Sequence, residues 1–112
     1  MPNPAQQKWF TQNDRRTSIA DILTDGKGNP LDLSNSTVAF RMVKKSDSTV
    51  KVNNAAATID STTKGEVSYA WGASDLDTAG SFWAWWILTS GGKTEHFPGD
   101  GKKLTVIVEP AL

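Results

Sequence analysis

Short apolar segments separated by turn-forming residues recur along this 112-residue chain. Side chains alternate between two faces over residues 37–44, where Val38, Phe40 and Met42 share one face, and the same period of two returns over residues 66–71. About seven such segments, spaced roughly 8–12 residues apart and without a helical period, predict an all-β fold, an antiparallel β-sandwich. The other predicted strands cover residues 18–24, 49–53, 81–89, 93–97 and 103–109, whereas residues 55–59 fit either a strand or a loop.

The N-terminal segment differs from the rest of the chain. Residues 1–14 are predicted to form an extended arm, followed by one sandwich domain over residues 15–112. Pro2 and Pro4 favour extended backbone, and the polar stretch that follows them has only Trp9 and Phe10 as apolar anchors. We expect the arm either to lie on its own domain or to reach a neighbouring molecule.

Charge and composition exclude several classes of protein. The chain has 12 Lys and Arg against 12 Asp and Glu, so it lacks the basic excess with which nucleic-acid binders displace counterions from phosphates. It has no Cys, which excludes disulfides and thiolate sites. No apolar run approaches the roughly 20 residues that span a bilayer, and the first residues do not form a signal peptide. We therefore expect no nucleic-acid partner and no membrane insertion.

The sequence also lacks the residue sets of catalytic and metal sites. Its single histidine, His96, has no evident nucleophile beside it and is expected at a strand surface or half-buried in a strand. Asp75 and Asp77 fall short of the about six to eight oxygens that calcium requires, and they are interpreted as turn formers. The glycine pairs lack the helix that follows a phosphate loop. We predict no catalytic residue, no cofactor and no metal, and therefore no enzyme.

The tryptophan-rich segment over residues 81–89 is bulky on both faces, although each strand of a sandwich has only one core face. One alternating set mixes large and small side chains along the whole strand, as interdigitating layers require, and is predicted to point inward. That inward set is Phe82, Ala84, Trp86 and Leu88, and the outward set is Trp83, Trp85 and Ile87. Large apolar side chains gathered outside the core usually mark an interaction site.

Three interpretations of the outward set are open. The arm, through Trp9 or Phe10, covers it; the set forms an interface with another protein; or it forms an aromatic platform for sugars. The interface is the preferred interpretation, because tryptophan is enriched among the residues that dominate binding energy. Its predicted residues are Trp83, Trp85 and Ile87 of the strand, with Trp9 and Phe10 of the arm.

A set of motifs, taken in order, resembles a known family over roughly residues 11–110. The motifs are Thr24-Asp25-Gly26-x-Gly28-Asn29-Pro30, Thr37-Val38-x-Phe40-Arg41-Met42, Gly65-x-Val67-x-Tyr69-x-Trp71, Asp75-x-Asp77-Thr78-Ala79-Gly80, Phe82-x-Ala84-x-Trp86 and Phe97-Pro98. In this order they are similar to the N-terminal domain family of the phage baseplate upper protein, an immunoglobulin-like module of tailed-phage structural proteins.

This resemblance implies an immunoglobulin-like sandwich in a non-enzymatic virion structural protein, assembled in the host cytoplasm. Such a protein docks onto other virion proteins, as a homo-oligomer or bound to a capsid or tail protein. The family module usually precedes further domains, so we expect a free-standing version in a chain that stops at Leu112. The family usually has polar residues where this chain has Trp83, Trp85 and Ile87, which leaves tail, baseplate and capsid decoration open. The alternative function is a carbohydrate-binding module for attachment to the host surface.

Overall fold

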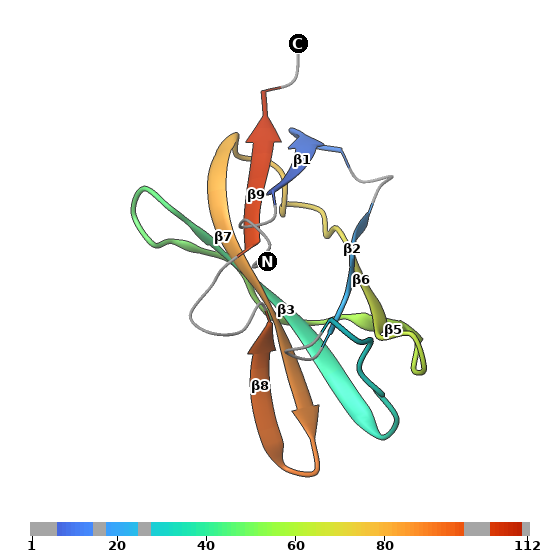
Figure 1. The fold of residues 1–112 in the computed structure, drawn as a ribbon. Helices are drawn as coiled ribbons and strands as arrows, with labels where there is room; N and C mark the ends of the chain where they lie inside the picture. The colour runs from blue at the N-terminus through green and yellow to red at the C-terminus, as the bar shows by residue number, and fades with distance from the viewer. Residues whose placement is uncertain (1–6, 15–17, 25–27, 98–103, 111–112) are drawn as a thin grey trace.

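The computed structural model describes residues 7–14, 18–24, 28–97 and 104–110, which form nine strands in two packed sheets (Figure 1). The all-β sandwich prediction is confirmed. The first six residues of the predicted arm, the turn at residues 25–27 and the loop at residues 98–101 lie outside the described residues. The strands are β1 (Gln7–Thr11), β2 (Ser18–Ile22), β3 (Ser36–Lys44), β4 (Val50–Ala56), β5 (Thr58–Ser61), β6 (Glu66–Ala70), β7 (Gly80–Ser90), β8 (Lys93–Phe97) and β9 (Leu104–Glu109).

The larger sheet is built around β7, the tryptophan strand. It has the order β1-β9-β7-β3-β4, and β8 also pairs with β7. The smaller sheet has the order β2-β6-β5 and covers one face of the larger sheet (Figure 1). The loop between β6 and β7 therefore crosses from one sheet to the other, and its leucine, Leu76, is buried.

The core lies between the two sheets and follows from the alternation of side chains along each strand. Phe82, Ala84 and Trp86 of β7 are fully buried, and Leu88 is nearly so, which confirms the predicted inward set. Burying large apolar side chains from both sheets is the main driving force for this fold. The largest fully buried side chains are Trp86, Phe40, Phe82, Ile19, Leu33, Met42, Leu76, Leu104, Val67, Val106 and Val108.

Two glycines form the tight turn between β7 and β8. Gly91 and Gly92 have φ angles of 59° and 81°, in the left-handed region that side chains with a Cβ atom rarely adopt. Two successive positive φ angles give the type I′ turn, whose twist matches that of the flanking strands. The turn joins the two predicted strands as a hairpin, and Ser90 pairs with Lys93 across it.

The N-terminal segment joins the larger sheet as its edge strand. β1 pairs with β9 in parallel, from Gln7 opposite Thr105 to Thr11 opposite Glu109, so the sandwich contains one parallel pair beside its antiparallel ones. Two further backbone bonds continue the attachment, from Gln12 N to Glu109 O and from Asn13 N to Leu76 O, each 2.8 Å long. The described part of the predicted arm thus lies on its own domain, while a boundary at residue 14 stays a prediction.

Candidate protein interface

The outward side of β7 carries the predicted interface residues of that strand. Trp83, Trp85 and Ile87 alternate with the buried inward set, and each is half-buried by the neighbouring strands of the larger sheet. The β1 strand adds Trp9, which has 58% of its surface exposed. Trp9 lies opposite Ile107 of β9, and Ile107 lies opposite Ser81, one alternate position before Trp83. We call the set Trp9, Trp83, Trp85, Ile87 and Ile107 the tryptophan face.

Phe10 does not share this face. As the neighbour of Trp9 in an extended strand, it points to the opposite side, and it packs against the core. Its ring meets Trp71 edge to face, with the ring centroids 4.9 Å apart. The structure therefore brings four of the five predicted interface residues to one face and separates Phe10 from them. Phe10 instead helps to hold β1 on the domain.

Ile107 is the member of the tryptophan face that the sequence prediction missed. The alternation of residues 103–109 places Leu104, Val106 and Val108 inward, which by itself leaves Ile107 outward. The order of the strands in the sheet cannot be read from the sequence. Only the pairing of β9 with both β7 and β1 brings Ile107 between Trp83 and Trp9. The contact is between segments far apart in the chain, and local patterns carry no such information.

Two cationic side chains flank the tryptophans. Lys45 Nζ lies 3.8 Å from the centroid of the Trp83 ring and donates a hydrogen bond to Thr105 Oγ1 at 3.2 Å. Arg41 lies opposite Trp85 in the register of β3 and β7, and its Nη1 donates to Asn53 Oδ1 at 2.8 Å. An ammonium group over an indole ring is attracted by the negative face of the π-system. The tryptophan face is thus apolar at its centre, with Arg41 and Lys45 on its β3 side and the exposed Glu109 on its β9 side.

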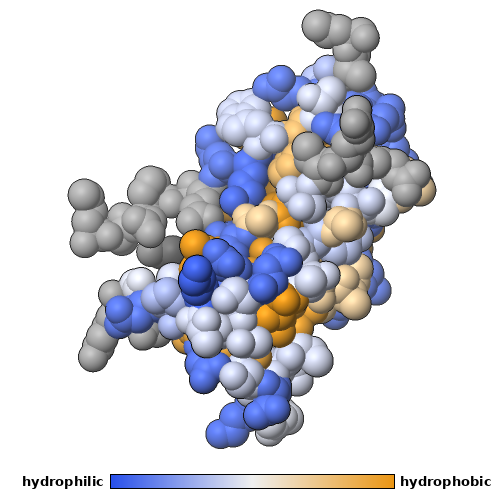
Figure 2. Space-filling model, turned by 90° about the vertical axis from the view of Figure 1, so that its right-hand side faces the viewer, coloured by the Kyte–Doolittle hydropathy of each residue, from blue (hydrophilic) through white to orange (hydrophobic). Residues whose placement is uncertain are grey.

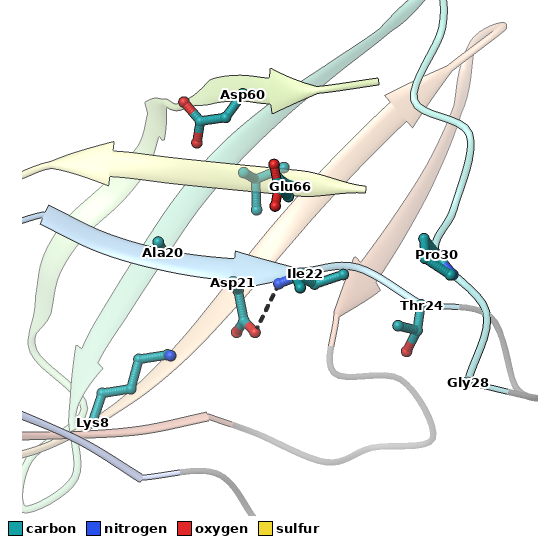
Figure 3. Close-up of a pocket in the computed structure, with 10 residues that line it drawn as sticks. Lys8, Ala20, Asp21, Ile22, Thr24, Gly28, Pro30, Asp60 and Glu66 are labelled. Carbon is teal, nitrogen blue, oxygen red and sulfur yellow. Dashed lines mark hydrogen bonds between the residues drawn. The ribbon is translucent and has the colours of Figure 1, made fainter. Parts of the chain in front are cut away.

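A shallow hollow of about 680 Å³ lies elsewhere on the molecule, at the smaller sheet (Figure 3). Three acidic side chains and one lysine line it: Asp21 of β2, Asp60 of β5, Glu66 of β6 and Lys8 of β1. Its apolar lining includes Ile22, whose side chain is 53% exposed. Figure 2 faces this side of the molecule and shows apolar atoms in a broken band between hydrophilic ones. We call this hollow the acidic pocket.

The candidate residues for catalysis and metal binding lie at a strand surface or in the loop between β6 and β7. His96 is exposed on β8, opposite Ile87. Asp75 Oδ2 accepts hydrogen bonds from Gly72 N at 2.7 Å and from Tyr69 Oη at 2.6 Å, as expected of a turn former. Asp77 pairs with Lys51. Within the described ranges, no group of three or more His, Cys, Asp or Glu side chains could hold a metal ion.

Several carboxylates have shifted pKa values. The hydrogen bond from Lys51, followed by that from Thr78, lowers the pKa of Asp77. Hydrogen bonds from Ser34 and from Thr49 lower the pKa values of Asp32 and Asp47. Burial, with the hydrogen bond to Asp75, raises the pKa of Tyr69. The three aspartates belong to turns or loops, and Tyr69 of β6 is bonded to the loop residue Asp75, so the shifts reflect how the loops are held.

Among the residues that the structure describes, no helix is long and apolar enough to cross a membrane. The chain matches no known family model, and no curated protein matches it. Among solved structures it is similar to the N-terminal domain of ORF48 of phage TP901-1, with a TM-score of 0.65 and 16% sequence identity. The match covers 96% of this chain and 90% of that one. At that identity the similarity shows a shared fold, and it confirms the fold that the resemblance to a phage N-terminal domain implies.

Proposed function

We propose that this chain is a non-enzymatic structural protein of a bacteriophage virion, and that it docks onto other virion proteins through the tryptophan face. The observation that carries the proposal is the outward side of β7, where three bulky apolar side chains stand on a central strand. Trp9 and Ile107 extend them onto the two next strands. An apolar surface of this kind, bordered by polar groups, is typical of protein interfaces.

The phage setting is supported by the fold shared with a phage domain over nearly the whole chain. The motifs of the sequence point the same way. The zero net charge also suits docking by shape and apolar contact, because it provides little field to steer a charged partner. The tryptophan face would be the docking surface whether the chain belongs to a tail, a baseplate or a capsid.

The carbohydrate-binding alternative has one observation in its favour. Arg41 and Asn53 lie beside Trp85 and supply the polar groups that sugar platforms use. However, sugars stack on an open ring face, and Lys45 covers one face of Trp83. The alternative therefore rests on Trp9 and Trp85, of which only Trp85 has these polar groups beside it, and docking to a protein is the better supported function.

The test is the incorporation of variants into phage particles. A phage that lacks the gene is complemented with the natural chain or with Trp85→Ser, and the copies of the chain per purified particle are counted by quantitative mass spectrometry. Trp85→Ser should lower that number at least about tenfold, the loss expected when a central aromatic anchor is truncated. Lys64→Ser is the control, since Lys64 is exposed in the turn between β5 and β6 of the smaller sheet, away from the tryptophan face.

Equal incorporation of both variants would overturn the proposal. A second measurement addresses the sugar alternative. Cell-wall polysaccharide is titrated against the purified chain while tryptophan fluorescence is followed. A saturable response that Trp85→Ser abolishes would favour carbohydrate binding instead.

A further inference from the structure

The two broad sides of the sandwich differ in charge. On the larger sheet, Arg41 and Lys45 border the tryptophan face. On the smaller sheet, the exposed Asp60 and the outward-facing Glu66 line the acidic pocket, while Asp21 and Lys8 line its inner edge, between the two sheets. The whole chain has a formal net charge of zero, so these opposite charges sit on one neutral molecule. Each side is complementary to the other side of a second copy.

The two sides also lie on opposite surfaces of the molecule. In β2 and β6, the residues Ile19 and Val67 are fully buried between the sheets, so their neighbours Ala20 and Glu66 face outward from the smaller sheet. The tryptophan face points outward from the larger sheet by the same alternation along β7. One copy can therefore use both surfaces at the same time, each toward a different neighbour.

Both sides combine the charge with exposed apolar surface. Beside the acids of the pocket lie Ala20, Ile22 and Pro30, and Ile22 is among the most exposed large apolar residues that the structure describes. Bulky side chains of the tryptophan face can rest on this surface while Arg41 and Lys45 approach Asp60 and Glu66. Apolar contact would supply affinity, and the charges would fix which surfaces meet.

We propose that the occupant of the tryptophan face is a second copy of this chain, docked by its acidic pocket. This inference rests on the proposed function and names its partner. The contact is head-to-tail, because different surfaces of the two copies meet, and repetition of such a contact builds a ring or a filament. The molecule measures 41 × 29 × 21 Å along its principal axes. Its broad sides are large enough for the about 800 Å² per partner of a standard interface.

The test uses two charge reversals in the full chain. Arg41→Glu places an acid beside Trp85 and removes the basic excess of that border, and Glu66→Lys removes the acidic excess of the pocket. Sedimentation velocity over a wide concentration range should show that the natural chain self-associates. Each variant alone should associate at least about tenfold more weakly, since like charges then face each other. Thermal unfolding of each variant shows that the fold persists.

A mixture of the two variants is the decisive measurement. In the mixture, the acid introduced by Arg41→Glu meets the base introduced by Glu66→Lys, and the unchanged surfaces also match. The mixture should therefore recover the association that each variant has lost. Recovery in the mixture supports the head-to-tail contact.

Three results would overturn it: a natural chain that stays monomeric, association that neither reversal weakens, or weakening by Arg41→Glu alone. The last result would indicate two tryptophan faces packed against each other. Each of these outcomes leaves the proposed function standing if Trp85→Ser still reduces incorporation into particles. Conversely, self-association in solution with normal incorporation of Trp85→Ser would count against the proposed function.

Discussion

Trp86 Nε1 donates a hydrogen bond to Asp21 Oδ2 across a distance of 3.3 Å, and this bond links the two sheets of the sandwich. The indole belongs to β7, at the centre of the larger sheet, and is fully buried. The carboxylate belongs to β2, an edge strand of the smaller sheet, and lines the acidic pocket. The largest core side chain thus has its one polar atom satisfied by a residue at the border of the core.

Replacing Asp21 tests the importance of this bond. Asp21→Ala should lower the free energy of unfolding by about 1–3 kcal/mol, because it leaves the buried indole N–H without an acceptor. Asp21→Asn keeps an acceptor oxygen and should retain most of that stability. Urea unfolding measures both, with Asp60→Ala as a control at an exposed acid of the same pocket. If Asp21→Ala costs no more than Asp60→Ala, the bond contributes nothing to stability.

The alternation of β7 gives two neighbouring tryptophans opposite roles in stability. Trp86→Ser should lower the free energy of unfolding by at least about 3–5 kcal/mol, because it removes a fully buried aromatic side chain and leaves a cavity. Trp85→Ser, on the half-buried outward side, should cost much less. Thermal unfolding of the isolated chain compares the two variants directly. Equal losses would contradict the assignment of the two faces.

Lys45 should stabilise the fold through Trp83 and Thr105. Lys45→Met keeps the length of the side chain and removes its charge, so it should cost about 0.5–1 kcal/mol, the range of a cation–π contact near a surface. Lys44→Met is the control, because Lys44 precedes it in the chain and is also half-buried. Chemical denaturation measures the free energy of unfolding of both variants. Equal losses for the two lysines would show that the contact between Lys45 and Trp83 does not stabilise the fold.

Tyr69 should couple stability to alkaline pH. Its folded-state pKa lies above the usual value of 10.0, first because burial disfavours the phenolate and then because Asp75 accepts its proton in a hydrogen bond. This contribution to stability is fully present below the unfolded-state pKa and is lost as pH rises toward the folded-state pKa. Above about pH 10 the stability of the natural chain should therefore fall more steeply than that of Tyr69→Phe, in which the titration of the lysines is unchanged.

Direct titration checks the cause of this pKa shift. Tyr69 is the only tyrosine, so the absorbance of tyrosinate reports its ionisation without interference from another phenol. Asp75→Asn removes the negative charge beside the phenol and should move the titration back toward the usual value. A natural chain that titrates like free tyrosine would refute the prediction.

The strands and the two faces of β7 could be predicted from the sequence because both depend on neighbouring residues. Alternation along residues 81–89 determines which side chains share a face. Because one face of the strand must be buried in the core, Phe82 and Trp86 are selected as inward residues. The turn at Gly91 and Gly92 is likewise local, since two positive φ angles favour glycine. These are the parts of the fold that sequence reasoning described correctly.

The tryptophan face was harder to predict because it is assembled from distant segments. The parallel pairing of β1 with β9 joins residues about as far apart as the chain allows, and it carries Trp9 onto the outward face while turning Phe10 inward. Lys45 reaches Trp83 only because the end of β3 lies beside the start of β7. The link between Asp21 and Trp86 likewise depends on how one sheet lies on the other.

The parallel pair of β1 and β9 also determines how the domain would respond to a pulling force. A force that draws residue 7 and residue 109 apart acts along both strands in opposite directions, because the chain enters β1 and leaves β9 at opposite ends of the pair. The hydrogen bonds along these five residue pairs are then loaded together in shear instead of opening one after another from an end. We expect high mechanical resistance in this direction, independent of how stable the fold is at equilibrium.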